Sequence, residues 1–528
     1  MIPDDPSAIK PILSELRDSY SQNKTRHVAF RRQQLYNLIV GIKELTPKFA
    51  EAAQKDLGYT EFANKLLSIQ ISLADIEHTH KHFEQWTKHT AVDTPLFIGP
   101  GKSYIVPEPL GVSLVMSAWN YPVFTALPPV ASAMAAGNCV VLKPSELSPN
   151  TSNVLKELFD KYLDKECYRV IEGKVETSKA IVKEHWDLII FTGSPEKGKL
   201  VAKAAAENLT PCILELGGKN PCIVDEDADL ENAALRVIQG RFTNSGQTCT
   251  APDYVFVHSK IKEKLTTKFI EKVKEFFTDK PENSLDLVKI VSPFHVNRLE
   301  ELIKEDHGGK ILIGGTCDAV NRFVYPTLID NPKFTSRLMQ EEIFGPILPI
   351  FEFEKIDNVI KFINERPKPL ALYYFGGIFN KNKHRFVKET SSGSIAINES
   401  LFQVLNPELP FGGVQNSGQL SLHGKFGFDS CSHKKAVFDK LSINGKIMEN
   451  RYPPTNESKI KRMLAFQQKT KHLYQSHIIQ GLLTLLVVFL ALIFYVKIVD
   501  PHYGGVLGFI REMLIGVANG IDKIPFKI

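Results

Sequence analysis

The sequence has little cysteine, and none of it is spaced as a disulfide framework or a zinc site requires. Seven cysteines are scattered over 528 residues, and no two form a Cys-x-x-Cys pair. The first 30 residues contain no apolar run, which argues against a cleaved secretory signal. We therefore expect a protein of a reducing compartment that faces the cytosol.

Two further absences narrow the function. The net charge is only +5, so the chain lacks the strong positive field of a nucleic-acid-binding protein. No Gly-x-Gly-x-x-Gly run occurs, so the common dinucleotide fingerprint is missing. The length exceeds that of one ordinary domain and predicts two or three.

Charge is missing altogether from the 19 residues Ile478–Val496, about the length that crosses a bilayer as a helix. A buried core helix is the alternative, although such helices usually carry a polar face. The preceding residues 442–477 hold seven Lys/Arg and two Glu. Basic residues on that side predict that residues 1–477 stay in the cytosol. A second apolar run around Val506–Ile521 is expected to lie in the interface or to pair with the first, and the sequence leaves both open.

The remaining chain reads as an α/β protein. Residues 9–90 have helical spacing, with Leu35, Leu38, Ile39 and Ile42 on one face. From about residue 103, short β-type runs alternate with helical stretches, which predicts a doubly wound parallel sheet. A second α/β section follows from about 213 to 400, and residues 405–440 are Gly-rich and predicted to be irregular.

Three stretches carry groups suited to carbonyl chemistry. Cys249 follows small, polar residues, and the backbone N–H groups around it suit a thiolate or an oxyanion. Glu215 precedes Gly217-Gly218, where a desolvated carboxylate serves as a general base. Asn120 follows a predicted strand and offers an amide donor. Taken singly, each has an ordinary alternative, namely a core cysteine, a surface carboxylate and a turn before proline.

Other stretches suit a nucleotide. Gly193 and Ser194 end a predicted strand and open a helix, whose N–H groups favour a pyrophosphate. Lys143 and Glu146 end a neighbouring strand, where they suit an adenosine ribose and disfavour a 2′-phosphate. Two further runs, Glu341–Pro346 and Pro410–Gly413, complete the group of stretches that could carry chemistry. Each can also be explained as an ordinary turn.

Taken together, these motifs resemble those of the aldehyde dehydrogenase superfamily over residues 10–440. The resemblance implies that Cys249 is the nucleophile and Glu215 the base that activates the deacylating water. Asn120, with the Cys249 N–H, would form the oxyanion hole. The cofactor, NAD with NADP possible, would be held by a further set of residues, namely Lys143, Glu146, Gly193, Ser194, Glu342 and Phe344. No metal ligands are expected.

Within the superfamily, the runs Glu215–Cys222 and Gln247–Tyr254 resemble the class 3 branch. The hydrophobic anchor is similar to that of membrane-bound fatty aldehyde dehydrogenases, of the fungal type that oxidises hexadecenal in sphingolipid breakdown. Three positions depart from the usual residues. Gln415 and Leu420 stand where glycine is common, and Glu399 where aspartate is common.

The resemblance also implies a domain plan with two Rossmann-like α/β domains, a β-hairpin oligomerisation element and a C-terminal transmembrane helix. The expected parts are 1–212 (NAD-binding, with the hairpin near 100–113), 213–400 (catalytic), 401–440 (oligomerisation and closing segment), 441–477 (basic linker and amphipathic helix), 478–496 (transmembrane anchor) and 497–528 (tail).

The expected function is oxidation of long-chain fatty aldehydes to fatty acids with NAD, by a homodimer at a bilayer. The catalytic part would face the cytosol at the endoplasmic reticulum, a lipid droplet, a peroxisome or the mitochondrial outer membrane. Small aromatic or medium-chain aldehydes are the alternative substrates, and a non-catalytic membrane scaffold is the alternative of another class.

Overall fold

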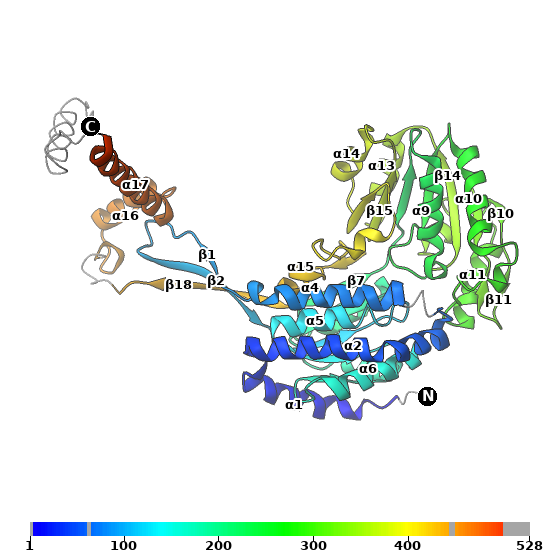
Figure 1. The fold of residues 1–528 in the computed structure, drawn as a ribbon, viewed down its shortest axis with the longest axis horizontal. Coiled ribbons are helices and arrows are strands. Elements are labelled where there is room, and N and C mark those ends of the chain that lie inside the picture. Colours follow the sequence, from blue (N-terminus) through cyan, green and yellow to red (C-terminus); the bar gives the residue numbers. More distant parts are fainter. Residues whose placement is uncertain (1–3, 61–64, 443–448, 500–528) are drawn as a thin grey trace. The chain divides into compact units, whose positions relative to one another are not determined.

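The computed structural model describes residues 4–60, 65–442 and 449–499 (Figure 1). The chain divides into two compact units. The larger comprises residues 1–88 and 107–434, and the smaller residues 89–106 and 435–528. Both predicted α/β sections lie in the larger unit, each built on its own sheet.

The first sheet is doubly wound around β3 (Val112–Met116). This strand pairs in parallel with β4 on one side and β6 on the other. The chain visits β4 and β5 before it returns to β6 and β7, so the strand order reverses between β3 and β6, and a crevice opens at their carboxyl ends. In spatial order the strands are β17 (Gly418–Gln419), β7 (Cys212–Leu216), β6 (Leu188–Gly193), β3, β4 (Cys139–Lys143) and β5 (Tyr168–Val170).

Helices cover this sheet and share one hydrophobic core with it (Figure 1). The predicted apolar face is confirmed, because Leu35, Leu38, Ile39 and Ile42 are all buried in α2. That helix ends at Gly58, whose φ of 75° suits glycine. The helical elements are η1 (Pro6–Ala8), α1 (Ile9–Ser21), η2 (Lys24–Arg26), α2 (Val28–Leu57), the π-helix η3 (Lys65–Gln70), α4 (Ile71–Trp86), α5 (Leu127–Ala136), α6 (Pro149–Tyr162), α7 (Val175–Ile181), α8 (Pro195–Ala206) and α15 (Gly424–Ser430).

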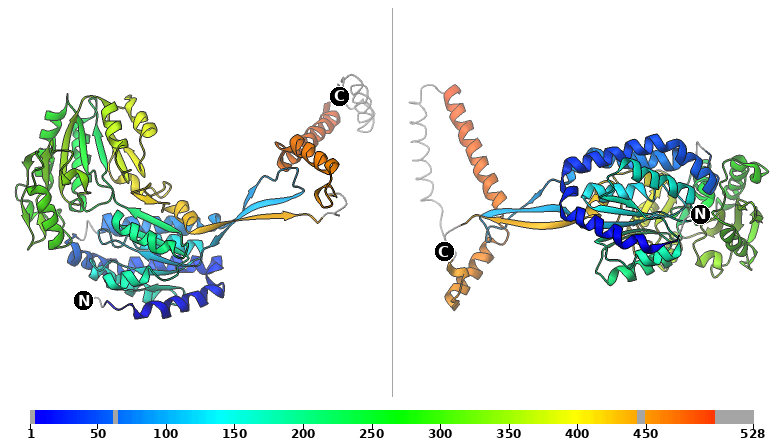
Figure 2. Two further views of the ribbon diagram at one scale, coloured as in Figure 1. Left: turned by 180° about the vertical axis from the view of Figure 1, so that it is seen from behind. Right: turned by 90° about the horizontal axis from the view of Figure 1, so that it is seen from below.

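The second sheet is parallel except for its edge strand β10, and helices lie on both of its faces (Figure 2). Alternate residues of β15 show this. Tyr373 belongs to one core cluster and Tyr374 to the other, so neither face meets water. In spatial order the strands are β10 (Lys310–Ile313), β13 (Thr327–Asp330), β14 (Ile347–Phe353), β9 (Tyr254–His258), β8 (Pro221–Val224), β15 (Ala371–Phe375) and β16 (Ser394–Ile397).

Further helices and one strand pair complete this half of the larger unit. They are α9 (Leu230–Phe242), η4 (Thr243–Gly246), α10 (Lys262–Phe277), η5 (Pro281–Asn283), α11 (Pro293–Lys304), the strand pair β11 (Cys317–Asp318) and β12 (Phe323–Val324), α12 (Arg337–Gln340), α13 (Ile356–Asn364), α14 (Asn382–Glu389) and η6 (Phe402–Leu405).

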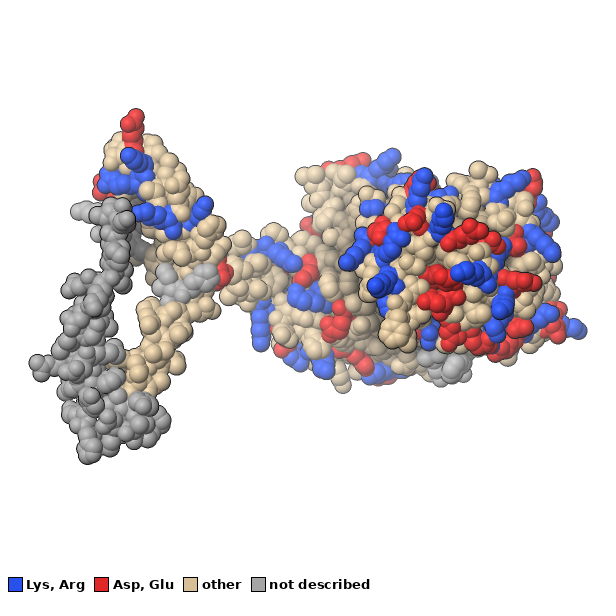
Figure 3. All heavy atoms as spheres, turned by 90° about the horizontal axis from the view of Figure 1, so that it is seen from above, with Lys and Arg blue, Asp and Glu red and all other residues tan. Residues whose placement is uncertain are grey.

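The smaller unit contains a three-stranded sheet and two helices. The strands are β1 (Thr90–Val92), β2 (Gly101–Pro109) and β18 (Ser432–Lys440), of which β2 and β18 continue into the larger unit. The prediction that residues 405–440 are irregular is therefore wrong at β18. The sequence of this strand is mostly polar and lacks the apolar pattern from which strands are predicted. The predicted amphipathic helix is α16 (Glu457–Thr470), where Lys and Arg side chains gather (Figure 3).

The predicted anchor Ile478–Val496 lies within α17 (Gln475–Val499). Among the residues that the structure describes, no helix offers an apolar stretch long enough to cross a membrane. The run Val506–Ile521 lies outside the described residues.

Candidate active site

Cys249 lies in the connection between η4 and β9, just after a sharp turn. Asn244, Ser245 and Gly246 have φ values of 54°, 50° and 72°, all left-handed. A Cβ on Gly246 would lie 2.3 Å from the carbonyl oxygen of Gly345, so only glycine fits there. Strained backbone of this kind persists where the surrounding structure holds it.

Hydrogen bonds from other elements hold the residues around Cys249. Asn120 and Asn244 both donate to the carbonyl oxygen of Gln247, and Asn220 donates to that of Cys249. On the two sides of Cys249, the Tyr121 hydroxyl bonds the Thr248 hydroxyl, and the Tyr373 hydroxyl donates to the Thr250 carbonyl. Their oxygen–oxygen distances are 2.8 and 2.5 Å.

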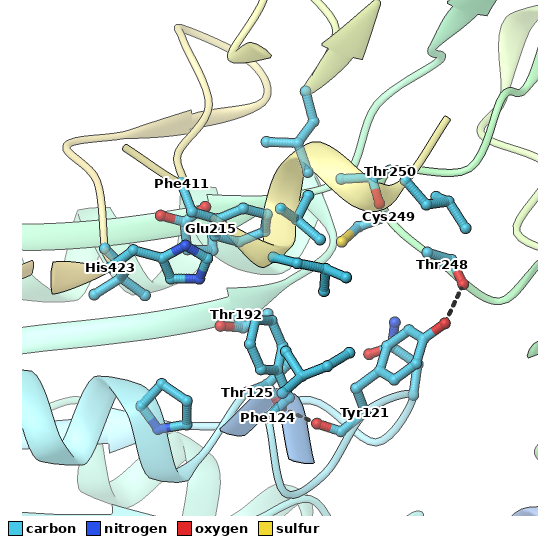
Figure 4. A pocket seen from close by; sticks show the side chains of 18 of the residues that line it. Tyr121, Phe124, Thr125, Thr192, Glu215, Thr248, Cys249, Thr250, Phe411 and His423 are labelled. Carbon is cyan, nitrogen blue, oxygen red and sulfur yellow. Dashed lines mark hydrogen bonds between the residues drawn. The ribbon is translucent and has the colours of Figure 1, made fainter. Parts of the chain in front are cut away.

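The Cys249 sulfur faces a cavity that Glu215 also lines (Figure 4). Burial raises the pKa of the thiol to about 12, and the nearby Glu342 and Glu215 carboxylates add to that rise. The N–H groups of Cys249 and Thr250 oppose it, because they donate to the sulfur. The same two donors would stabilise an oxyanion formed beside the sulfur.

Glu215 lies near the end of β7 between β6 and β17, and it is 3% exposed. Neither of its carboxylate oxygens has a hydrogen-bond partner within the described part of the chain. Burial therefore raises the pKa of this carboxyl well above its ordinary value. A buried, unpaired carboxyl can accept a proton from a substrate or a water that enters the cavity.

Two cavities meet at these residues. One of about 120 Å³ has a mostly apolar lining, and the other of about 790 Å³ lies over the carboxyl ends of β3 and β6. Cys249, Glu215 and Asn120 line both. The three predicted catalytic side chains, from three separate segments, are thus brought to one place.

The larger cavity fits a dinucleotide. It lies where the strand order reverses, and Gly193 and Ser194 line it at the start of α8. A Cβ on Gly193 would lie 2.6 Å from the Phe191 ring, so a side chain there would have to displace it. Lys199, His295 and Arg298, which the sequence analysis missed, add basic groups to the lining.

Glu342 and Phe344 line the same cavity. The Glu342 carboxylate accepts a hydrogen bond from the Gly218 N–H, while burial and the Asp253 charge raise its pKa to about 8. The Phe344 ring packs edge-on against Trp119, with centroids 5.5 Å apart. Both predicted residues therefore lie near Cys249 on one loop.

Lys143 and Glu146 lie at the carboxyl end of β4, beside β3. Their side chains pair at 3.1 Å, and Lys143 is buried. Neither is among the described residues that line the two cavities. Their predicted contact with an adenosine ribose stays a prediction.

Gln415 and Leu420, which stand where glycine is common in the class 3 branch, both have a left-handed backbone conformation. Gln415 has a φ of 57° and Leu420 a φ of 60°. Since L-residues adopt this region at a cost, the usual glycine has a physical explanation at both positions.

A half-buried thiol, a nearby buried carboxyl, amide donors and a dinucleotide-sized cavity together suit covalent oxidation of a carbonyl compound. In the described residues, no group of three or more His, Cys, Asp and Glu is placed to hold a metal ion.

Comparisons with known proteins agree with this chemistry. The profile of the "Aldehyde dehydrogenase family" matches residues 5–437. The chain is 40% identical to the 4,4'-diaponeurosporen-aldehyde dehydrogenase of Staphylococcus aureus over 85% of this chain and 96% of that protein. It is 38% identical to aldehyde dehydrogenase family 3 member A2 of Mus musculus, over 84% and 91%.

A dimeric NADP-preferring aldehyde dehydrogenase of Canis lupus familiaris is 39% identical, over 85% of this chain and 98% of that protein. Among solved structures, the substrate-bound state of Staphylococcus aureus AldH superposes with a TM-score of 0.82 at 39% identity. That match covers 87% of this chain and 99% of that one.

Proposed function

The chain belongs to the class 3 branch of the aldehyde dehydrogenase family, an NAD(P)-dependent family of oxidoreductases, and we propose that it oxidises long-chain fatty aldehydes at a membrane surface. The product is the fatty acid, formed through a thioester on Cys249.

The apolar cavity beside Cys249 carries the substrate proposal. Its lining from η6 continues to the molecular surface, where Phe402 is 46% and Leu405 37% exposed. Leu409, four residues after Leu405, is 48% exposed. An alkyl chain too long for the 120 Å³ cavity therefore has apolar surface to follow on its way out.

The chemistry follows from the placed groups. The Cys249 thiol gives its proton to solvent water, its sulfur adds to the aldehyde carbon, and the carbonyl electron pair moves to oxygen, which Asn120 and the Cys249 N–H hold. A bound nicotinamide would supply the acceptor for the hydride that leaves this carbon as the carbonyl re-forms. Glu215 then takes a proton from water, which attacks the thioester and breaks the carbon–sulfur bond. The acid leaves, and Glu215 passes its new proton to the Cys249 sulfur.

The binding roles are proposed as well. Gly193 and Ser194 hold the pyrophosphate at the start of α8, and Glu342 and Phe344 hold the nicotinamide riboside. Lys143 and Glu146 hold the adenosine ribose. We further propose residues 1–212 as the cofactor-binding domain, residues 213–400 as the catalytic domain and 401–440 as the closing segment.

Membrane placement rests on the smaller unit. The described side chains of α17 include exposed Leu482, Leu485 and Val487, and basic residues of α16 precede them. A long-chain aldehyde partitions into lipid by about 0.8 kcal/mol per methylene, so a tethered enzyme meets a concentrated substrate. The cytosolic face of an endoplasmic reticulum, lipid droplet, peroxisomal or mitochondrial outer membrane suits this placement.

A homodimer is proposed from relatives whose names call them dimeric. The three-stranded sheet of β1, β2 and β18 is the proposed oligomerisation element, since its outer strands have unpaired edges within the described sheet.

Comparing kcat/KM for hexadecanal and benzaldehyde tests the substrate proposal, with the full-length protein in lipid vesicles. We expect hexadecanal to be favoured at least about tenfold, because several methylenes are buried along η6. Equal values, or a preference for benzaldehyde, would reject a long-chain substrate and leave a small-aldehyde dehydrogenase. Extraction of the membranes with alkaline carbonate tests the anchor separately, and release of the protein would reject it.

A further inference from the structure

The buried carboxylate of Asp253, four residues after Cys249, joins three segments of the site. Its side chain is 2% exposed. One carboxylate oxygen lies 2.5 Å from the Lys219 ammonium. The other lies 3.0 Å from the Arg241 guanidinium and accepts a hydrogen bond of 3.2 Å from the Ile343 N–H.

Two of these partners, Lys219 and Ile343, belong to segments with a role in the proposed reaction. Lys219 lies four residues after Glu215, in the turn that follows β7. Ile343 lies between Glu342 and Phe344. The contact therefore ties the base and the cofactor loop to the segment that carries the nucleophile.

Lys219 uses all three of its N–H donors in this contact. Besides Asp253, it donates to the carbonyl oxygens of Leu338 and Glu341, at 2.7 and 3.0 Å. Both acceptors come just before Glu342, so one ammonium holds the start of the cofactor loop at two points.

Such a buried charge cluster is a poor source of net stability. Removing a charge from water is costly, and a hydrophobic replacement of similar volume is often neutral for stability. Burial lowers the pKa of the Lys219 ammonium, and the Asp253 charge opposes that shift. What this cluster provides and an apolar core would not is a set of directional contacts, which fix the segments relative to one another.

We propose that Lys219 and Asp253 are positioning residues that fix the Glu342–Phe344 loop relative to Cys249. The proposal rests on the proposed function, since it assigns that loop to the cofactor. Neither residue takes part in bond making. Misplacing a binding group by about 1 Å costs up to about 10²-fold in rate, so loss of this contact is expected to weaken cofactor use.

The test is Lys219→Met in the full-length protein, with Lys262→Met as the matched control. Lys262 lies 2.9 Å from Asp330, and its side chain is 16% exposed against 14% for Lys219. Calorimetric titration with NAD+, without aldehyde, measures the dissociation constant. We expect it to rise about tenfold in Lys219→Met and to stay within about twofold of wild type in the control.

Steady-state kinetics provide a second measurement that a general loss of stability would not reproduce. The KM for NAD+ rises in Lys219→Met, while the KM for the aldehyde stays within about twofold. Unchanged NAD+ affinity in folded Lys219→Met, or an equal loss in the control, overturns the proposal.

If Lys219→Met does not fold, Asp253→Asn serves in its place, because its amide oxygen still accepts from Arg241 and Ile343 while the charge opposite Lys219 is lost. Unchanged NAD+ affinity in folded Asp253→Asn would likewise overturn the proposal. A wild-type protein that binds NAD+ but forms no NADH from any aldehyde would instead refute the proposed function.

Discussion

The side-chain amide of Asn120 donates a hydrogen bond to the carbonyl oxygen of Gln247, with a nitrogen–oxygen distance of 3.0 Å. This contact holds the amide beside the segment that carries Cys249. An amide nitrogen has two hydrogens, so the second is available to an oxyanion.

Asn120→Ala is therefore expected to lower kcat about 10²–10³-fold, since it removes a donor to the developing negative charge. Steady-state kinetics measure the change, and NAD+ affinity is expected to stay within about threefold. Asn208→Ala, at an exposed position after α8, is the control. A drop of less than about threefold in the folded Asn120 variant would remove this residue from the oxyanion hole.

Cys249→Ser is expected to abolish NADH formation, by on the order of 10³-fold or more, because a hydroxyl is a far weaker nucleophile here than a thiolate. NAD+ binding should remain, since the change is a single atom. Cys317→Ser on β11 controls for loss of a thiol. Turnover close to wild type in Cys249→Ser would overturn the assigned nucleophile.

Glu215→Gln is expected to slow steady-state turnover about 10²–10⁴-fold while the first turnover persists. The reason is that the proposed base acts on the thioester, after hydride has left. Rapid mixing should show a burst of NADH equal to the enzyme present, and mass spectrometry an acyl group on Cys249. Glu207→Gln is the exposed control. Loss of the burst along with turnover would contradict a role confined to deacylation.

The raised pKa of Glu215 also predicts a pH dependence of stability. Above about pH 4.5, the unfolded chain loses this proton while the folded protein keeps it. The folded state then binds more protons, so Glu215 lowers the free energy of unfolding as pH rises, by about 1.4 kcal/mol per pH unit up to the folded pKa. Glu215→Gln removes that loss. Urea unfolding should show a larger gain in this variant at pH 8 than at pH 5, and an equal gain at both would be contrary evidence.

Asp56 offers a test of stability away from the chemistry. Its buried carboxylate accepts from the N–H groups of Asn150 and Thr151 at the start of α6, and from both of their side chains, at 2.7 to 3.1 Å. Asp56→Ala should cost about 2–4 kcal/mol, measured by urea unfolding. Asp160→Ala, in an exposed pair with Lys156 on the same helix, should cost less than about 0.5 kcal/mol.

Much of the fold follows from local patterns. The strands expected from about residue 103 onward are present, and those that begin at Cys139, Leu188, Pro221 and Tyr254 are examples, because buried parallel strands need continuous apolar runs. The strand β18 was missed for the opposite reason. Its sequence Ser432–Lys440 is mostly polar and exposed, so it forms through pairing and not through burial.

The site was predictable only where its groups stand in short motifs. Cys249, Glu215 and Asn120 each lie in such a motif, and they line the same cavities. The Asp253 contact could not be foreseen, because Lys219, Arg241 and Ile343 are distant along the chain. Lys219, Arg241 and the Ile343 N–H meet at Asp253 only in the folded protein. His423, which lines the apolar cavity, was not among the predicted site residues.

The alternation along β15 has a consequence for how this protein tolerates insertions and deletions. The Tyr373 hydroxyl reaches the Thr250 carbonyl from one face, and the Tyr374 hydroxyl reaches Asp225 from the other. Losing or gaining one residue at the start of the strand would put one tyrosine in the other's place and an apolar residue, Leu372 or Phe375, in the remaining position. A one-residue insertion or deletion far from the reacting sulfur would thus break the contact to the Thr250 carbonyl, just after the nucleophile, or the contact to Asp225 on the opposite face. Changes of chain length should therefore collect in the connections around β15 and spare the strand itself.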